Sequence, residues 1–421
     1  MSFLINGQDI NDIAALVSSS TYIHPAFYTT SNTSGVIKNW SPTHSSLGPA
    51  LIRDDASGSR ELYPELFDDL TKGKLLINNI AYPIAKVGNY PLALPISSSS
   101  WYSSNFYTIT NTDNYYNLYV QRTNDLYEAY NIYIRLNNST SNLYTFSCRS
   151  LLIAGVGGGG GGGANTHPFP LFSYNGGGGG AGGGMILWLY IKGYNDTQEH
   201  CIARMKVGAG GHNAGNRVFG SSGFIGSFGS PGKPSAGEKT WIEWFIDGNT
   251  YHADMGGGGA GHAGSDTKSS GGSAIFWLNS EANSYSEKSI IEDNNIKIRI
   301  IKIVNGGRGG GKVQLGDASE FNLSVSEIPT CRVASSNSVT LGYKWDSYTG
   351  TSANGPDPSG PGWGGCSLLG RGGYMTWSGK TITLRSPTGY GSGGVGNACL
   401  TLTGNYVSGS GGRPGVLRFM Y

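Results

Sequence analysis

Charge is scarce in this sequence, and the few basic residues are scattered. Only 13% of the 421 residues are charged, about half of the roughly 25% that is usual in a globular protein. The formal net charge is +2, and the densest basic stretch is "KIRIIKIV", residues 297–304. Because nucleic-acid binding needs a concentrated basic surface, this distribution argues against a nucleic-acid partner.

Paired cysteines and long apolar runs are missing as well. The five cysteines are widely spaced, without a CxxC pair or a Cys/His cluster, so the sequence predicts free, buried thiols, no metal site and no cofactor. The longest apolar run, Met185–Ile191, is far shorter than the roughly 20 residues of a membrane-spanning helix. The N-terminus lacks the basic and apolar regions of a signal peptide. We therefore expect a protein that is made in the cytoplasm and does not insert into a membrane.

Catalytic motifs are also absent from the sequence. There is no G-x-S-x-G, and "GGRGGGKV", residues 306–313, lacks the spacing and the Ser/Thr of a phosphate-binding loop. The segment 241–254 contains Glu243, Asp247, His252 and Asp254. These carboxylates fit a solvated strand and turn better than the facing pair that a glycosidase needs. The sequence therefore indicates that the protein is not an enzyme.

Glycine is abundant instead, with 69 residues, and its densest tracts contain almost nothing else. Residues 157–163 are seven glycines in a row, and residues 176–184 are glycine except for Ala181. Further dense tracts lie at residues 208–215, 256–264 and 306–311. Glycine does not occupy every third position, so the tracts are not collagen-like.

We interpret these tracts as scaffold and not as flexible linkers. A linker tolerates polar side chains anywhere, whereas the two longest tracts exclude every side chain larger than a methyl, which indicates close backbone approach. Ordering nine glycines costs about 10–20 kcal/mol, and only dense packing could offset that cost. We therefore predict a core of packed, polyproline-II-like glycine strands. The glycines assigned to this core are Gly157, Gly160, Gly163, Gly176, Gly180, Gly184, Gly208, Gly211, Gly256 and Gly259.

The rest of the sequence predicts a mostly β protein. Alternating apolar residues indicate strands at 129–136, 200–207, 380–385, 398–403 and 416–421. In the second of these, Cys201, Ala203, Met205 and Val207 should share a face. Helix signals occur only at residues 9–17, with Asp9 as N-cap, and 64–73. We divide the chain into a small α+β region (1–90), a β module (91–150), a glycine-rich domain (151–315) and a C-terminal glycine-rich β region (316–421).

The order of the glycine tracts carries a resemblance to a known family. An apolar strand enters one tract, a second tract leads into a strand, and "VGAGG" (207–211), "GSSGF" (220–224) and "GGGGAG" (256–261) follow. This order resembles the glycine-rich domain of tail-fibre and receptor-binding proteins of tailed bacteriophages. The end, "GSGGRPGVLRFMY" (409–421), is similar to the end of such a domain, and "FLINGQDINDI" (3–13) is similar to starts of phage tail proteins.

The resemblance implies a non-enzymatic tail protein of the virion, made in the host cytoplasm. In the tip adhesins of T-even-like phages, glycine motifs pack as polyproline II helices, and variable loops between them contact the bacterial surface. The partners implied are a bacterial receptor, either a glycan or an outer-membrane protein, and other tail proteins bound through residues 1–90. Both a homotrimer and a single copy fit this family. Two alternatives stay open: a purely structural tail component and a capsule-degrading tail enzyme.

The loops between the tracts are the expected receptor-binding sites. Aromatic and arginine side chains in such loops suit contacts with sugars, carboxylates or protein loops. The first loop, residues 164–175, contributes His167, Phe169, Phe172 and Tyr174, and the second, residues 212–220, contributes Asn216, Arg217 and Phe219. Alternatively, Phe169 and Phe172 fold inward as a small core. A third loop contains Asp266 and Lys268, and residues 348–363, which end in Trp363, are a fourth candidate.

Overall fold

The structure is a computed structural model, and the described residues are almost entirely β. It describes residues 4–5, 8–9, 74–77, 80–83, 106–122, 130–148, 150–169, 172–214, 233–311, 314–324, 338–343, 361–378, 381–399 and 406–420. Within these ranges there is no helix, and all paired strands run antiparallel. The prediction of a mostly β protein is therefore confirmed for the described part of the chain.

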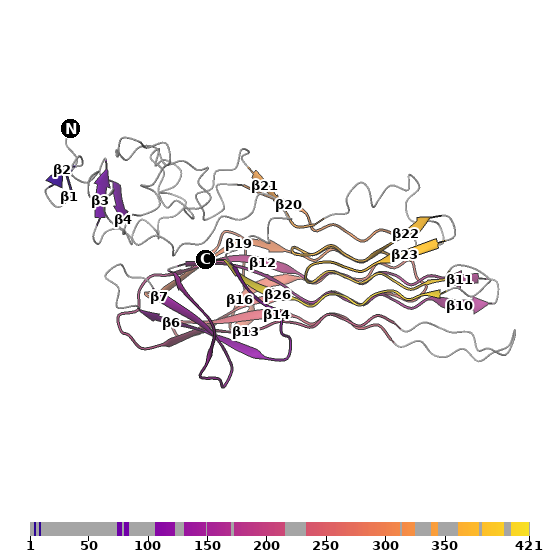
Figure 1. The fold of residues 1–421 in the computed structure, drawn as a ribbon, viewed down its shortest axis with the longest axis horizontal. Helices are drawn as coiled ribbons and strands as arrows, with labels where there is room; N and C mark the ends of the chain where they lie inside the picture. Colours follow the sequence, from indigo (N-terminus) through magenta and orange to yellow (C-terminus); the bar gives the residue numbers. More distant parts are fainter. Residues whose placement is uncertain are drawn as a thin grey trace.

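Two large sheets form a sandwich at one end of the described molecule (Figure 1). The six-stranded sheet has the order β18 (Ile290–Glu292), β19 (Ile296–Val304), β12 (Gly184–Ile191), β9 (Ser150–Val156), β26 (Val416–Met420) and β5 (Phe106–Ile109). The eight-stranded sheet has the order β17 (Ser280–Tyr285), β16 (Ala274–Leu278), β15 (Asn249–Met255), β14 (Thr240–Ile246), β13 (His200–Lys206), β6 (Tyr115–Arg122), β7 (Tyr130–Leu136) and β8 (Asn142–Cys148).

Apolar residues from both sheets meet in one core, as alternation along the strands requires. Leu118, Ile132 and Trp244 of the eight-stranded sheet share this core with Leu187 and Ile298 of the six-stranded sheet. Each of these side chains is almost fully buried. The opposite face of the eight-stranded sheet is partly exposed to solvent at alternate positions. We call it the open face of this sheet.

The prediction that Cys201 shares a face of β13 with Ala203, Met205 and Val207 is wrong for Cys201. Strand β13 shifts register against β6 between Cys201 and Ala203, and a β-bulge of this kind moves a side chain to the other face. As a result Cys201 is exposed, and Ile202 is buried beside Ala203. The thiol of Cys201 is free, so the prediction of buried thiols fails there. It holds for Cys366, which is free and fully buried, and burial raises its pKa to about 12.

Six small two-stranded sheets complete the strand list. They are β1 (Leu4–Ile5) with β2 (Gln8–Asp9), β3 (Lys74–Ile77) with β4 (Ile80–Pro83), β10 (Thr166–Phe169) with β11 (Phe172–Tyr174), β20 (Phe321–Ser324) with β21 (Ser338–Leu341), β22 (Tyr374–Ser378) with β23 (Thr381–Arg385), and β24 (Ala398–Cys399) with β25 (Tyr406–Val407). Asp9, the predicted N-cap, is the last residue of β2. The remainder of the predicted helix at 9–17, and the predicted helix at 64–73, lie outside the described residues.

Long extended segments leave the sandwich and run side by side away from it (Figure 1). We call these segments together the glycine bundle. They are residues 157–163, 176–183, 208–214, 233–239, 256–262, 269–273, 305–311, 361–366, 391–397 and 408–415. Most continue a sandwich strand directly: β9 runs into 157–163, for example, and 176–183 runs into β12.

Hydrogen bonds in the bundle repeat every third residue, which is the period of a polyproline II helix. Successive N–H groups of residues 157–163 point in three directions. Gly157, Gly160 and Gly163 donate to Gly183, Gly180 and Gly177; Gly158 and Gly161 donate to Glu238 and Ser235; Gly159 and Gly162 donate to Arg413 and Ser410. The carbonyls of the same segment accept from residues 208–214, 256–262 and 391–397. This segment therefore contacts six neighbours, three as donor and three as acceptor.

The second long tract is surrounded in the same way. Residues 176–183 donate to 256–262, 306–311 and 391–397, and they accept from 157–163, 269–273 and 361–366. Backbone groups of both central segments are thus paired although the residues are fully buried, as buried amides require.

Strand register passes from the sandwich into the bundle without a shift. In the sandwich, Val156 lies opposite Gly184. The bonds from Gly157 to Gly183 and from Gly160 to Gly180 continue that register outward. The pairs β13–β14, β15–β16 and β9–β26 continue into the bundle in the same manner. The strands therefore set the alignment of glycine segments that have no side chains to align them.

Close approach of neighbouring backbones explains why these positions are glycine. An added Cβ at any of the ten predicted core glycines would lie within 3.0 Å of its nearest neighbour atom. At Gly161 the carbonyl oxygen of His212 would be only 1.8 Å away. None of the glycines in residues 157–163 and 176–184 has a positive φ, so space, and not backbone conformation, demands glycine there.

The two sheets also cross the boundaries drawn from the sequence. Strands β6, β7 and β8, from residues 91–150, belong to the same sheet as β13 of the glycine-rich region, and β6 pairs with β13 directly. Strand β26, from the C-terminal region, lies between β9 and β5. The described parts of residues 91–421 thus share one sandwich and one bundle.

Replacing Gly161 with alanine should destabilise the protein strongly. The methyl would collide with a backbone carbonyl that is itself fixed by its neighbours, and overpacking of this kind costs about 3 kcal/mol or more. The control is Gly193→Ala, because a Cβ there meets only the Tyr130 hydroxyl at 3.8 Å. Thermal unfolding measures both variants, and equal shifts of the midpoint would contradict the close packing at Gly161.

Amides of residues 157–163 should exchange slowly with deuterated solvent. Every N–H group in that range donates a hydrogen bond, and every residue is buried. The N–H groups of Gly210 and Ala260 have no acceptor among the described residues and should exchange fast, which gives an internal control. Random-coil exchange across 157–163 would show that the tract is a linker after all.

Candidate functional site

The first predicted loop forms a hairpin at the end of the bundle remote from the sandwich (Figure 1). Strands β10 and β11 pair with Thr166 opposite Tyr174 and Phe169 opposite Phe172. The pairing at Thr166 keeps the register that runs from β9 and β12 through the bundle. Asn165 and Asn175, at the base of the hairpin, are buried. The predicted residues His167, Phe169, Phe172 and Tyr174 therefore all belong to this one hairpin.

The second loop is described only at its edges. Asn216, Arg217 and Phe219 lie outside the described residues. On the side that leads to them, the Ala214 N–H donates to Gly162 at 2.9 Å. His212, two residues earlier, is exposed. The chain thus reaches this loop beside the base of the β10–β11 hairpin.

The third loop starts at the same end of the bundle. The carbonyl of His262 accepts a hydrogen bond from the Gly177 N–H at 2.8 Å. His262 is exposed to solvent. Gly264 has a φ of 56°, which allows the chain to turn there. Loops one, two and three therefore leave the bundle within a few residues of Gly163 and Gly177.

Lys268 of the third loop has a structural role. Its ammonium group lies 2.7 Å from one oxygen of Asp317, and the Arg308 guanidinium lies 2.7 Å from the other. Partial burial alone would raise the pKa of Asp317, but the hydrogen bonds from Lys268 and Arg308 outweigh it and lower the pKa below its usual 3.8. This ion-pair cluster fastens the loop to the segment 305–311. Asp266, the other predicted residue of the loop, is exposed.

Trp363, the last residue of the fourth candidate loop, belongs to the bundle. It is buried, and its carbonyl accepts a hydrogen bond from Gly310 at 2.8 Å. Its ring lies 5.4 Å from that of Tyr374. The candidate loop that precedes it falls mostly outside the described residues.

Two of the carboxylates considered for catalysis, Glu243 and Asp247, are separated along the β14–β15 hairpin. Asp247 and Gly248 have φ values of 48° and 74° and form the β14–β15 turn, a conformation typical of two-residue hairpins. Glu243 lies four residues earlier, about 13 Å along the strand. It pairs with Arg204 and lies 3.4 Å from His252 Nδ1. Glu243 and Asp247 therefore do not face each other as an acid and a base would.

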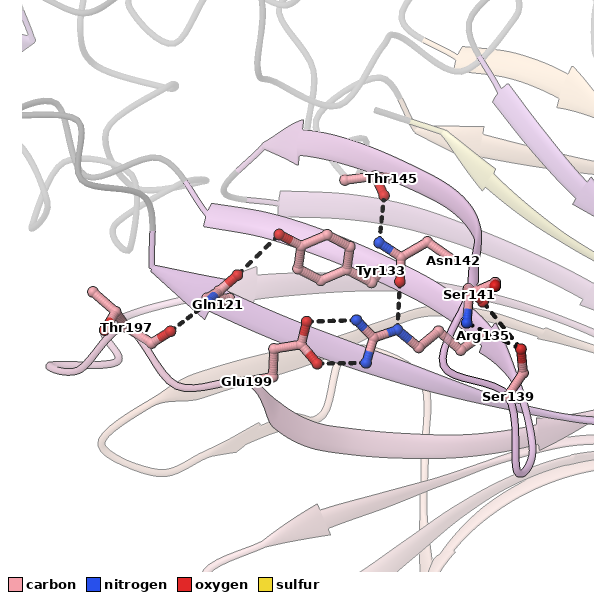
Figure 2. A network of polar contacts seen from close by, with 9 residues as sticks. All are labelled: Gln121, Tyr133, Arg135, Ser139, Ser141, Asn142, Thr145, Thr197 and Glu199. Carbon is pink, nitrogen blue, oxygen red and sulfur yellow. Dashed lines mark hydrogen bonds and ion pairs between the residues drawn. The ribbon is translucent and has the colours of Figure 1, made fainter.

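Sequence reasoning missed the open face of the eight-stranded sheet. Its outward positions hold aromatic and charged residues, and Figure 2 shows one corner of it, where Arg135 faces Glu199 in a bidentate pair. The Arg135 guanidinium also lies 5.0 Å from the Tyr119 ring and 5.4 Å from the Tyr133 ring. The available signal was the alternation of 115–121 and 130–136, in which tyrosines and an arginine fill the outward positions.

Comparison with known proteins identifies no relative: the chain matches no family model and no curated protein. Within the described ranges, a helix with the length and apolar character of a membrane span is absent. The same residues include no group of three or more His, Cys, Asp or Glu side chains placed to hold a metal ion.

Asp317→Asn should make stability less dependent on acid pH. Because the folded protein lowers the pKa of Asp317, its carboxylate stabilises the fold above pH 3.8, and this contribution is lost as the pH falls further. At neutral pH the variant should lose about 1 kcal/mol. Unfolding titrations between acid and neutral pH measure both effects, with the exposed Asp266→Asn as control. Equal losses in both variants would rule out the ion-pair cluster as the anchor of the loop.

Proposed function

We propose that this chain is a receptor-binding protein of a bacteriophage tail or tail fibre. The observation that carries the proposal is the common origin of three loops at the end of the glycine bundle opposite the sandwich (Figure 1). Loops that share one rigid base form a compound binding surface, in the way that loops on other scaffolds do. The aromatic residues of the β10–β11 hairpin then make the primary contact with the host.

Rigidity of the bundle supports a role in recognition. The hairpin continues the register of β9 and β12, and each central glycine segment is held by six neighbours. A loop presented on a fixed base loses less conformational entropy when it binds, so more of its contact energy appears as affinity. The bundle supplies reach and fixed geometry, and the loops supply specificity.

The proposed partners follow from this orientation. The hairpin end contacts a glycan or an outer-membrane protein of the bacterium, since aromatic side chains serve either. Residues 1–90, which we propose to be a small α+β attachment region, join the chain to other tail proteins of the virion. In this proposal the polyproline-II-like glycine domain is the spacer between the two ends.

Replacing the hairpin should abolish binding to host cells. The test is a full-length, fluorescently labelled chain in which residues 166–174 are exchanged for a glycine-serine stretch of equal length, applied to a panel of intact bacteria. The unaltered chain should stain selected strains, and the variant should lose at least about tenfold in affinity.

The matched control exchanges residues 137–141, the exposed β7–β8 turn. Staining that survives the hairpin exchange would refute the assignment of the binding site. Failure of the unaltered chain to stain any strain would favour a purely structural tail component.

A further inference from the structure

The open face of the eight-stranded sheet has the composition of a second binding surface. Its outward residues include Tyr115, which is 47% exposed, and Phe245, which is 38% exposed. The Trp241 ring lies 5.8 Å from the Tyr115 ring and leans toward it across strand β13. Large rings on the solvent side of a sheet are not needed for the core, which is filled from the other face by Ile242 and Trp244.

We propose that this face binds a neutral polysaccharide chain, at a site separate from the loops of the bundle. Sugar rings present C–H groups that pack on aromatic faces and hydroxyl groups that bond to polar side chains. Trp241 supplies such a face. Tyr115 and Phe245 add apolar area on either side of it, although the Lys206 ammonium and the Arg204 guanidinium each lie 5.3 Å from one of these two rings. Glu243 and Arg204, between them, supply acceptors and donors.

Most charges on this face are already paired, which favours a neutral ligand. Lys206, whose ammonium group lies 5.3 Å from the Tyr115 ring, has no carboxylate partner among the described residues. Arg135 is held by Glu199 (Figure 2), Arg204 by Glu243, and Lys239 lies 3.2 Å from Asp254. A strongly acidic or basic ligand would have to compete with these pairs for one partner. Hydroxyl groups can instead use the remaining lone pairs and N–H groups without breaking a pair.

The shape of the face fits a polymer. A row of directly opposed residues crosses six strands, from Arg135 on β7 to Trp277 on β16. Near its end the His252 and Trp277 rings stack at 4.2 Å. Six strands span about 24 Å. Tyr115 and Trp241 lie two residues to one side of this row and Phe245 two residues to the other, so an extended chain lying across the strands would run between these rings.

A second copy of this protein suits the face less well. The centres of protein–protein interfaces are depleted in charged residues, and a partner protein would bury Arg204, Glu243 and Asp254 together. The desolvation free energy of paired charges exceeds their electrostatic attraction unless further hydrogen bonds form in the interface. A hydrated polysaccharide leaves much of that water in place.

The test measures binding of the full-length chain to an array of neutral and acidic bacterial polysaccharides. The double variant Tyr115→Ala/Trp241→Ala should bind neutral polysaccharides about tenfold more weakly, and Phe245→Ala should weaken binding too. Ile290→Ala is the matched control, because Ile290 is 50% exposed but lies on the other sheet. Thermal unfolding verifies that each variant is folded.

The exchange of residues 166–174 separates this site from the proposed tip. It should leave binding to neutral polysaccharides intact even if staining of cells is lost. The proposal is overturned if no neutral polysaccharide binds, if only the hairpin exchange weakens binding, or if light scattering finds a dimer that Tyr115→Ala/Trp241→Ala dissociates.

Discussion

Hydrogen bonding between backbones that lie too close for any side chain is the constraint on which this structure depends. At Gly158 and Gly161, a neighbouring carbonyl oxygen occupies the space that a Cβ would need. The entropy cost of ordering so much glycine is offset only because every N–H group of the two central segments, and most of their carbonyls, find partners in a dense array. One misplaced methyl therefore disturbs two segments at once, and the tracts contain almost no residue but glycine.

The sandwich determines which glycine segments lie side by side and in what register, and the bundle extends that arrangement away from the sandwich. Glycine segments are chemically alike, so nothing in them specifies which segment should lie beside which, or in what alignment. The apolar strands provide that information, because a slip of one residue in β9 or β12 would turn its core side chains to the wrong face. The aligned strands then pass their register outward, as far as the hairpin at Thr166.

The sequence predicted the features that depend on local composition, such as the glycine packing and the strand positions. It did not predict the features that depend on residues distant in the chain. The exclusion of side chains from residues 157–163 was enough to predict close packing, and alternation located β7 and β13. The bulge at Cys201 depends on pairing with β6, which no local pattern encodes. The place of Trp363 in the bundle involves a hydrogen bond from the Gly310 N–H to its carbonyl, between residues that are neighbours in space alone. The residues proposed for recognition could be predicted as loops, but their common origin at one end needed the bundle.

The position of β26 has a consequence for how the protein comes to fold. This strand lies between β9 and β5, so residues 106–109 have no partner in the six-stranded sheet until residues 416–420 arrive. Contacts between such distant parts of a chain make folding slow. On the ribosome, β5 and one edge of β9 stay open while the glycine segments emerge. The six-stranded sheet can be completed only after β26 has been synthesised. A chaperone that shields these unpaired strand edges would therefore have to stay bound until the end of synthesis.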